Sequence, residues 1–181
     1  SGSSISRNTT TASTGSTRAG GIHTSGESFI TMEEGSEISG NKCIQEASDT
    51  TNKFGYAGGI YLGGQSTFIM KGGKIIGNEA GDYGGGIVLS GHVTGGTTFT
   101  MEGGEIAGNK AGTTGGGIYL SDGSSFTLNR GAVYGNNDAN GSSKNIAGVE
   151  ASSNTGHAIY DGRTGVTSRA YDTNVSPGLS L

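Results

Sequence analysis

The strongest constraint on this chain is a ten-residue stretch that occurs twice with its charges inverted. Residues 71–80 read KGGKIIGNEA, and residues 102–111 read EGGEIAGNKA. The glycines, the inner Ile, the Gly-Asn pair and the final Ala recur, whereas Lys and Glu exchange places at every charged position. A repeat with a period of about 20–50 residues is typical of proteins built from stacked copies of one unit.

Further copies extend the repeat in both directions. A Gly-Gly-Ile opening begins at Gly20, Gly58, Gly85 and Gly116, and a degenerate copy reads His157-Ala158-Ile159. An alternating apolar segment follows the first four openings, at residues 30–32, 68–70, 99–101 and 126–128, and a Gly-Asn pair comes after each segment. Alternation with a period of two predicts β-strands, and no segment has the periodicity of an amphipathic helix.

We therefore predict an all-β fold, a single-stranded parallel β-helix solenoid of about five coils with three short strands in each coil. The whole chain, residues 1–181, is expected to form one domain. The predicted units are a partial N-terminal coil at 1–19, repeats at 20–57, 58–84, 85–115 and 116–156, and a partial C-terminal coil at 157–181.

Stacking explains the inverted charges. Equivalent residues in adjacent coils lie about 4.8 Å apart, a distance at which like charges repel and opposite charges attract. Three columns alternate in sign: Glu33, Lys71 and Glu102; Glu37, Lys74 and Glu105; Lys42, Glu79 and Lys110. We expect these charge ladders to oppose a slip of register by one coil.

Other columns predict the interior. Apolar residues at equivalent positions form columns that include Ile60, Ile87, Ile118 and Ile159, and Phe68, Phe99 and Phe126. The asparagines of the Gly-Asn pairs are expected to form a hydrogen-bonded ladder of Asn41, Asn78, Asn109 and Asn136. Cys43 falls in the column of Ala80 and Ala111, which favours a buried small residue over a reactive thiol.

The repeats resemble those of right-handed parallel β-helix proteins, the pectate-lyase-like superfold. The GGGI runs at Gly84 and Gly115 and the segment Phe126-Thr127-Leu128-Asn129 are similar to the GGA[ILV] and FxxN repeats of polymorphic outer-membrane autotransporter passengers. One copy reads FxxN, whereas others read FIMK and FTME. The likeness covers about residues 20–140, and it implies a right-handed coil in a bacterial protein that is extracellular or on the cell surface.

Composition argues against several classes of protein. The net charge is −4 with both signs interspersed, whereas nucleic-acid binders usually present a basic face. No apolar run is long enough for a transmembrane helix. The single Cys excludes an internal disulfide and a multi-Cys metal site. We expect no metal, no cofactor, no nucleic-acid partner and no membrane span in this chain.

Function is expected on the outward columns. The first strand of each coil presents His23, Tyr61, Val88, Tyr119 and Tyr160 outward, and an expanded corner adds Phe54 and Tyr56. Exposed aromatic residues can stack on sugars or pack against a partner, although aromatic residues on a solvent face also reflect β-propensity. Thr67, Thr98 and Ser125 form a second outward surface. A regular array of hydroxyl residues would suggest ice binding, but this interpretation is weaker because Phe29 and Ile69 interrupt the rows.

Catalytic groups are not expected. The carboxylates mostly alternate with Lys, and His23, His92 and His157 occupy different registers. Glu79 and Asp82 are the best acid candidates for an alternative function, a carbohydrate-binding or polysaccharide-degrading protein that acts through a groove beside the tyrosines. The expanded corners would flank this groove with Asp49, Lys53, Asp138, Lys144 and Glu150.

The termini suggest self-assembly. Ile5 and Asn8 match Ile38 and Asn41, so the chain is expected to begin with the third strand of a coil. Ile159 and Val166 instead match the first and second strands of a coil. Copies could complete one another head to tail and form a filament; alternatives are an excised segment of a longer β-helix and true caps. The predicted function is that of a non-catalytic extracellular structural or adhesive protein, whose partners are further copies, surface glycans or other cells.

Overall fold

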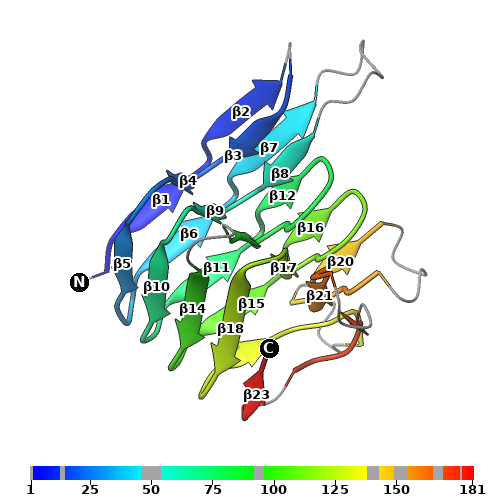
Figure 1. Cartoon of the computed structure of the whole chain (residues 1–181). Coiled ribbons are helices and arrows are strands. Elements are labelled where there is room, and N and C mark those ends of the chain that lie inside the picture. The colour runs from blue at the N-terminus through cyan, green and yellow to red at the C-terminus, as the bar shows by residue number, and fades with distance from the viewer. Residues whose placement is uncertain are drawn as a thin grey trace.

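The computed structural model describes residues 2–12, 15–45, 54–91, 96–137, 143–148, 155–164, 169–175 and 177–181. Every helix or strand among these residues is a β-strand. The strands form sheets whose members come from successive parts of the chain, as Figure 1 shows, and they pair in parallel except near the C-terminus.

Five sheets contain the strands. Sheet A consists of β1 (Ser4–Ser6), β6 (Glu37–Ser39), β11 (Lys74–Ile76), β15 (Glu105–Ala107) and β19 (Ala132–Val133). Sheet B consists of β2 (Thr9–Ala12), β7 (Lys42–Gln45), β12 (Glu79–Ala80), β16 (Lys110–Ala111) and β20 (Ile146–Ala147). Sheet C pairs β3 (Thr17–Ala19) with β8 (Gly55–Ala57). Sheet D consists of β4 (Ile22–Thr24), β9 (Ile60–Gly63), β13 (Ile87–Ser90), β17 (Ile118–Leu120), β21 (Ile159–Asp161) and β22 (Arg169–Tyr171). Sheet E consists of β5 (Phe29–Met32), β10 (Thr67–Met70), β14 (Thr97–Met101), β18 (Ser124–Leu128) and β23 (Leu179–Ser180).

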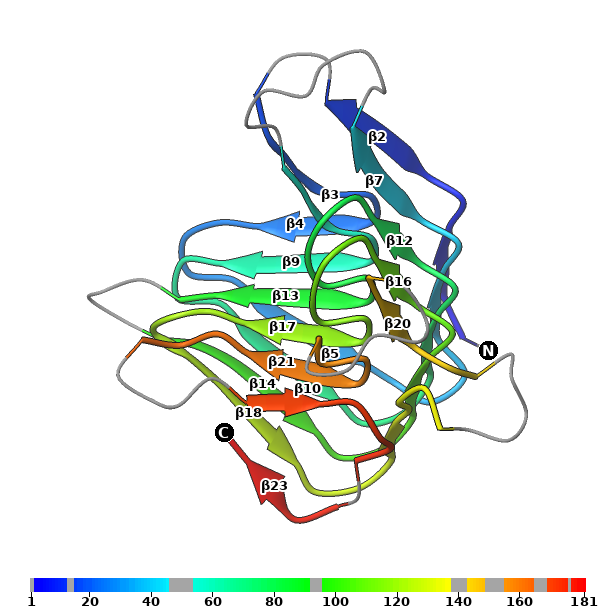
Figure 2. The ribbon, with the colours of Figure 1, turned by 90° about the vertical axis from the view of Figure 1, so that its right-hand side faces the viewer.

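The chain passes through sheets D, E, A and B and returns to sheet D, adding one strand to each of these sheets per turn (Figure 2). This arrangement is consistent with a β-solenoid, and we call each turn a coil. The prediction of three strands per coil was wrong, because a coil contains four or five. The Gly-Asn corner divides the expected third strand from a strand of sheet B, and the middle strands of sheet B are as short as Glu79–Ala80.

The apolar columns form the core. Ile60, Ile87, Ile118 and Ile159 pair in one register and are buried. Phe68, Phe99 and Phe126 stack in sheet E, with ring centroids 4.7 and 4.9 Å apart. Cys43 is buried beside Ala80, as predicted. In the first coils, Ile22 and Ile30 are only partly buried.

An asparagine ladder joins the coils at the corner between sheets A and B. The Oδ1 atom of Asn78 accepts hydrogen bonds from the backbone N–H and the side-chain Nδ2 of Asn41, both at 3.0 Å. Asn109 accepts the same two bonds from Asn78, at 2.9 and 3.0 Å. Asn8 adds a rung in the first coil, donating to Asn41 from its backbone and side chain at 3.1 and 2.9 Å.

Asn136 does not belong to this ladder, contrary to the prediction. Asn109 donates instead to the Oδ1 atom of Asn145, at 2.8 Å from its backbone and 3.0 Å from its side chain. The backbone N–H of Asn136 donates to the carbonyl oxygen of Asp172 in the C-terminal segment. An insertion therefore lies before the ladder residue of this coil, between Val133 and Asn145.

The second glycine of each Gly-Gly-Ile opening packs against this ladder. A Cβ atom added to Gly86 would lie 2.6 Å from the carbonyl oxygen of Gly117 in the next coil and 3.1 Å from Nδ2 of Asn109. Gly21 and Gly59 make the equivalent approaches to Asn41 and Asn78. The fifth copy can carry Ala158 here because the strand that follows it in sheet D is the antiparallel β22.

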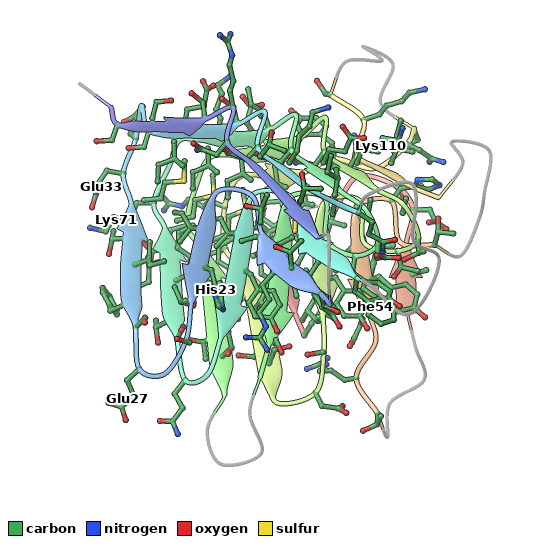
Figure 3. The ribbon with its side chains drawn as sticks, turned by 90° about the horizontal axis from the view of Figure 1, so that it is seen from above. His23, Glu27, Glu33, Phe54, Lys71 and Lys110 are labelled. Atoms are coloured by element: carbon green, nitrogen blue, oxygen red, sulfur yellow. The ribbon has the colours of Figure 1, made fainter. Side chains whose placement is uncertain are left out.

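The charge columns stack as predicted, and each contains an ion pair. Lys71 binds Glu33 at 2.8 Å, with both side chains exposed at the edge of the molecule (Figure 3). Lys42 binds Glu79 at 2.8 Å. Lys74 binds Glu105 and is in register with Glu37 on its other side. The hydrogen bond to the partner carboxylate raises the pKa of each of these lysines.

The two ends of the stack differ. Residues 169–181 return antiparallel: β22 pairs with β21, Val175 pairs with Val133, and β23 pairs with β18. The predicted first strand of the last partial coil is confirmed, because Ile159 pairs with Ile118 in parallel. The described residues after it return antiparallel in place of a further coil, and Val166 lies outside the described residues. At the other end β1, β2, β3, β4 and β5 are edge strands, and Ile5 pairs with Ile38 in the register expected for a last strand.

Gly86→Ala should destabilise the protein by about 3 kcal/mol, because its Cβ atom overpacks a site bounded by backbone and by the asparagine ladder. The matched control is Ala158→Gly, the equivalent position in the last coil, which should cost about 1 kcal/mol. Urea denaturation measures both values. Equal losses in the two variants would contradict the proposed contact.

Exchanging Lys71 and Lys74 for Glu should lower the urea midpoint, because three acidic residues then stack in each column. Adding Glu102→Lys and Glu105→Lys should restore part of the loss. Since exposed charges are screened by salt, the differences should shrink in concentrated NaCl. A quadruple variant no more stable than the double variant would refute this account of the columns.

Cys43 should react with a thiol reagent only after unfolding, since burial raises its pKa to about 11 from 9.0. The unfolded chain loses this proton first as pH rises. The thiol's contribution to stability is therefore complete below about pH 9 and is lost as pH rises toward 11. Cys43→Ala, which copies Ala80, should fold normally and lack this loss in alkaline denaturation curves. Rapid labelling of the native protein would show that the thiol is accessible.

Candidate functional site

Aromatic side chains gather at the corner between sheets C and D. We call this cluster the aromatic row; its members are His23, Phe54, Tyr56, Tyr61, Tyr83, Tyr119 and Tyr160. Neighbouring ring centroids lie between 5.0 Å, for Tyr83 and Tyr119, and 6.1 Å, for Phe54 and Tyr83. Tyr119 and Tyr160 are nearly parallel, with an interplanar angle of 6°. The row crosses successive coils along the stacking direction.

The sequence predicted six of these residues, and the structure brings all six together. Two members of the row, His23 and Phe54, are labelled in Figure 3. Val88, predicted to point outward with the tyrosines, is only 2% exposed. It lies among the larger side chains that line the same pocket, so the row covers it.

Sequence reasoning missed Tyr83 and Arg18. The guanidinium carbon of Arg18 lies 5.7 Å from the ring centroid of Tyr61, a distance suited to a cation–π contact. The signal was available: Arg18, Tyr56 and Tyr83 each stand four residues before the Ile of a Gly-Gly-Ile opening. Arg18 and Tyr56 lie on the two strands of sheet C, and Tyr83 continues their column beyond the sheet, beside the column on sheet D.

The row lines a pocket of about 320 Å³. Its walls carry the hydroxyl groups of Ser90 and Ser121 in addition to the rings. Burial, reinforced by the neighbouring tyrosines, raises the pKa of Tyr56 and of Tyr119. These phenols therefore stay neutral at physiological pH and act as hydrogen-bonding groups with apolar faces.

The acid candidates are engaged in structural contacts. Glu79 is paired with Lys42. An Asp82 carboxylate oxygen accepts hydrogen bonds from the side chain of Gln45 at 2.6 Å and from the backbone N–H of Gly55 at 3.0 Å, which anchors the strand that carries Tyr56. The expected loop residues Asp49, Lys53, Asp138 and Glu150, and also His92, lie outside the described residues.

The two described histidines, His23 and His157, lie in different surroundings. His23 is exposed at one end of the row, and burial together with Arg18 lowers its pKa. His157 is buried, and its Nδ1 atom accepts a hydrogen bond from the backbone N–H of Ala147 at 3.0 Å. Within the described part of the chain, no three His, Cys, Asp or Glu residues are grouped to hold a metal ion, and no helix could cross a membrane.

On the outer surface of sheet E, apolar residues interrupt the rows of threonines, as expected. Thr67 pairs with Phe29 on one side and Thr98 on the other, and the hydroxyl of Thr98 donates to that of Thr67 at 3.3 Å. Ile69 stands between Thr31 and Thr100 in the next rank. This surface is therefore less uniform than the aromatic row.

Comparison with protein-family models, with curated proteins and with solved structures found no match.

Proposed function

We propose that this protein is a non-catalytic adhesive protein of the cell surface that binds glycan chains along the aromatic row. The observation that carries this proposal is the continuity of the row, in which rings from several coils contact one another and line one pocket. Aromatic faces pack against the apolar faces of sugar rings, and Tyr offers a large contact area with few rotatable bonds.

The spacing of the row suits a polymeric ligand. Coils repeat about every 4.8 Å, so a chain of sugars lying along the stack meets a new ring at each step. Ser90, Ser121 and Arg18 add polar groups that can bind sugar hydroxyls or acidic substituents. A pocket with aromatic walls and a few polar groups is typical of binding sites.

The cell-surface location rests on the resemblance of the repeats to autotransporter passengers and, more broadly, to right-handed parallel β-helix proteins. The parallel sheets are compatible with that fold. The non-catalytic part of the proposal is supported by the positions of Glu79 and Asp82, whose carboxylates make structural contacts.

Tyr61→Ser combined with Tyr119→Ser should weaken glycan binding about thirtyfold, because two stacking contacts of about 1 kcal/mol each are lost. A glycan array finds the ligand, and titration calorimetry gives the affinities. The control is Phe29→Ser, which removes an aromatic residue that is 69% exposed on sheet E, away from the row.

The Phe29 variant should keep the thermal transition of the wild type, whereas the tyrosine variant should stay folded with a lower transition, because Tyr61 and Tyr119 flank the buried Val88. Unchanged binding in the double tyrosine variant, or an equal loss in the Phe29 variant, would refute the proposed surface. Release of sugar fragments by the wild-type protein would instead identify a polysaccharide-degrading enzyme.

A further inference from the structure

We propose that the aromatic row receives one uncharged sugar ring of its glycan in the pocket between Tyr61 and Tyr119, and that Val88 determines this specificity because it leaves a gap in a column of rings. This proposal rests on the proposed function. It names the class of sugar that the pocket selects and the residue that creates the pocket.

Val88 interrupts a column of rings on sheet D. In register it lies between Tyr61 and Tyr119. Where no such residue intervenes, Tyr119 and Tyr160 lie in adjacent coils, and their nearly parallel rings are 5.8 Å apart. Tyr61 and Tyr119 lie two coils apart instead, so their equivalent atoms are separated by about 9.6 Å. The pocket lies at this interruption.

A single ring matches the size of the gap. Atoms in van der Waals contact lie about 3.5–4.0 Å apart, so a ring that touched both tyrosines would need about 7–8 Å between them. The pocket volume of about 320 Å³ is at the lower end of the range of about 300–1,000 Å³ that is typical of ligand pockets. Val88 is only 2% exposed, so it acts through the space that its small side chain leaves rather than through contact with the ligand.

The two sides of the pocket differ in polarity. Tyr83 lies on one side, with its ring 5.0 Å from that of Tyr119. Ser90 and Ser121 follow Val88 and Tyr119 by two residues and therefore point to the same side of the sheet. The hydroxyl of Ser121 donates to the carbonyl oxygen of Leu89 at 3.2 Å, which leaves its oxygen able to accept a hydrogen bond. A sugar ring has matching parts, because its C–H faces pack on aromatic rings and its edge carries hydroxyl groups.

The lining of the pocket is uncharged. The described residues that line it are Phe54, Tyr56, Tyr61, Tyr83, Val88, Ser90, Tyr119 and Ser121. Burial raises the pKa of Tyr56 and of Tyr119, so both phenols are neutral at physiological pH. Arg18 contacts the ring of Tyr61 but is not among these lining residues. A carboxylate on the bound sugar would lose water without gaining a cationic partner, so the pocket favours a neutral sugar over the corresponding uronic acid.

Matched pairs of ligands test the charge of the sugar. Oligosaccharides of glucose, galactose and mannose are compared with oligosaccharides of the corresponding uronic acids, whose rings differ only in the carboxylate at C6. Titration calorimetry should show that a neutral series binds and that its uronic acid counterpart binds about tenfold more weakly. Equal or tighter binding of the uronic acids would overturn the proposal, and so would the absence of binding to every neutral series. The proposed function itself fails only if no glycan on the array binds.

Variants of Val88 test the gap. Val88→Tyr should close it with a further ring and abolish binding of the neutral series, and the thermal transition should show that the variant is folded. Tyr119 and Tyr160 show that this column accepts tyrosine. The control is Val88→Ile, which keeps a branched aliphatic side chain and should bind like the wild type. A folded Val88→Tyr variant with wild-type affinity would overturn the proposal, whereas the proposed function would stand if the double tyrosine variant still lost binding.

The hydroxyl side of the pocket provides a second test if Val88→Tyr does not fold. Ser90→Ala combined with Ser121→Ala should weaken binding of the neutral series about tenfold, because two hydrogen bonds to the sugar are lost. Unchanged affinity in this variant would overturn the placement of the sugar in the pocket.

Discussion

The asparagine ladder is the interaction on which the rest of the structure depends. The side chains of Asn78 and Asn109 each accept two hydrogen bonds from the preceding coil, and each also donates to a carbonyl oxygen of that same coil. A buried amide that lost these partners would leave unsatisfied polar groups in the interior. Gly21, Gly59, Gly86 and Gly117 lie directly against it, and a side chain on them would push the coils apart. Two short motifs that are separated in each repeat are therefore parts of one contact.

Fixed stacking has a consequence for the surface. Once the ladder sets the distance between coils, every outward position forms a column, and neighbours in a column must be compatible. Lys and Glu satisfy this requirement by alternating, whereas rings satisfy it by contacting one another. The aromatic row arises where two columns meet at a corner, one that runs from Tyr56 on sheet C to Tyr83 and one on sheet D with Tyr61 and Tyr119.

The same requirement determines what could be predicted from the sequence. The core residues, the charged residues of the ladders and Cys43 all occupy fixed positions in the repeats. Their neighbours in adjacent coils could therefore be assigned without a structure. Sheets B and C were missed because most of their strands have only two or three residues, too few to show an alternation. Asn136 was predicted because it stands three residues after Val133, as Asn109 stands after Ile106, and no sequence pattern indicates that the insertion precedes the ladder residue. The antiparallel pairing of β22 and β23 was missed because residues 169–181 contain no copy of the repeat.

One column of the core has a polar residue at each of its ends. In sheet D, the column of Leu62, Leu89 and Leu120 ends in Asp161, which is 2% exposed and forms two hydrogen bonds with Arg163, at 2.8 and 2.7 Å. A buried carboxylate is tolerated only with such a partner, so an apolar residue could not simply continue the column. At the opposite end the same column ends in Thr24, whose hydroxyl group is hydrogen-bonded to Ser66. Polar groups thus end this column at both ends of the stack, whereas the Ile and Phe columns beside it end in apolar residues.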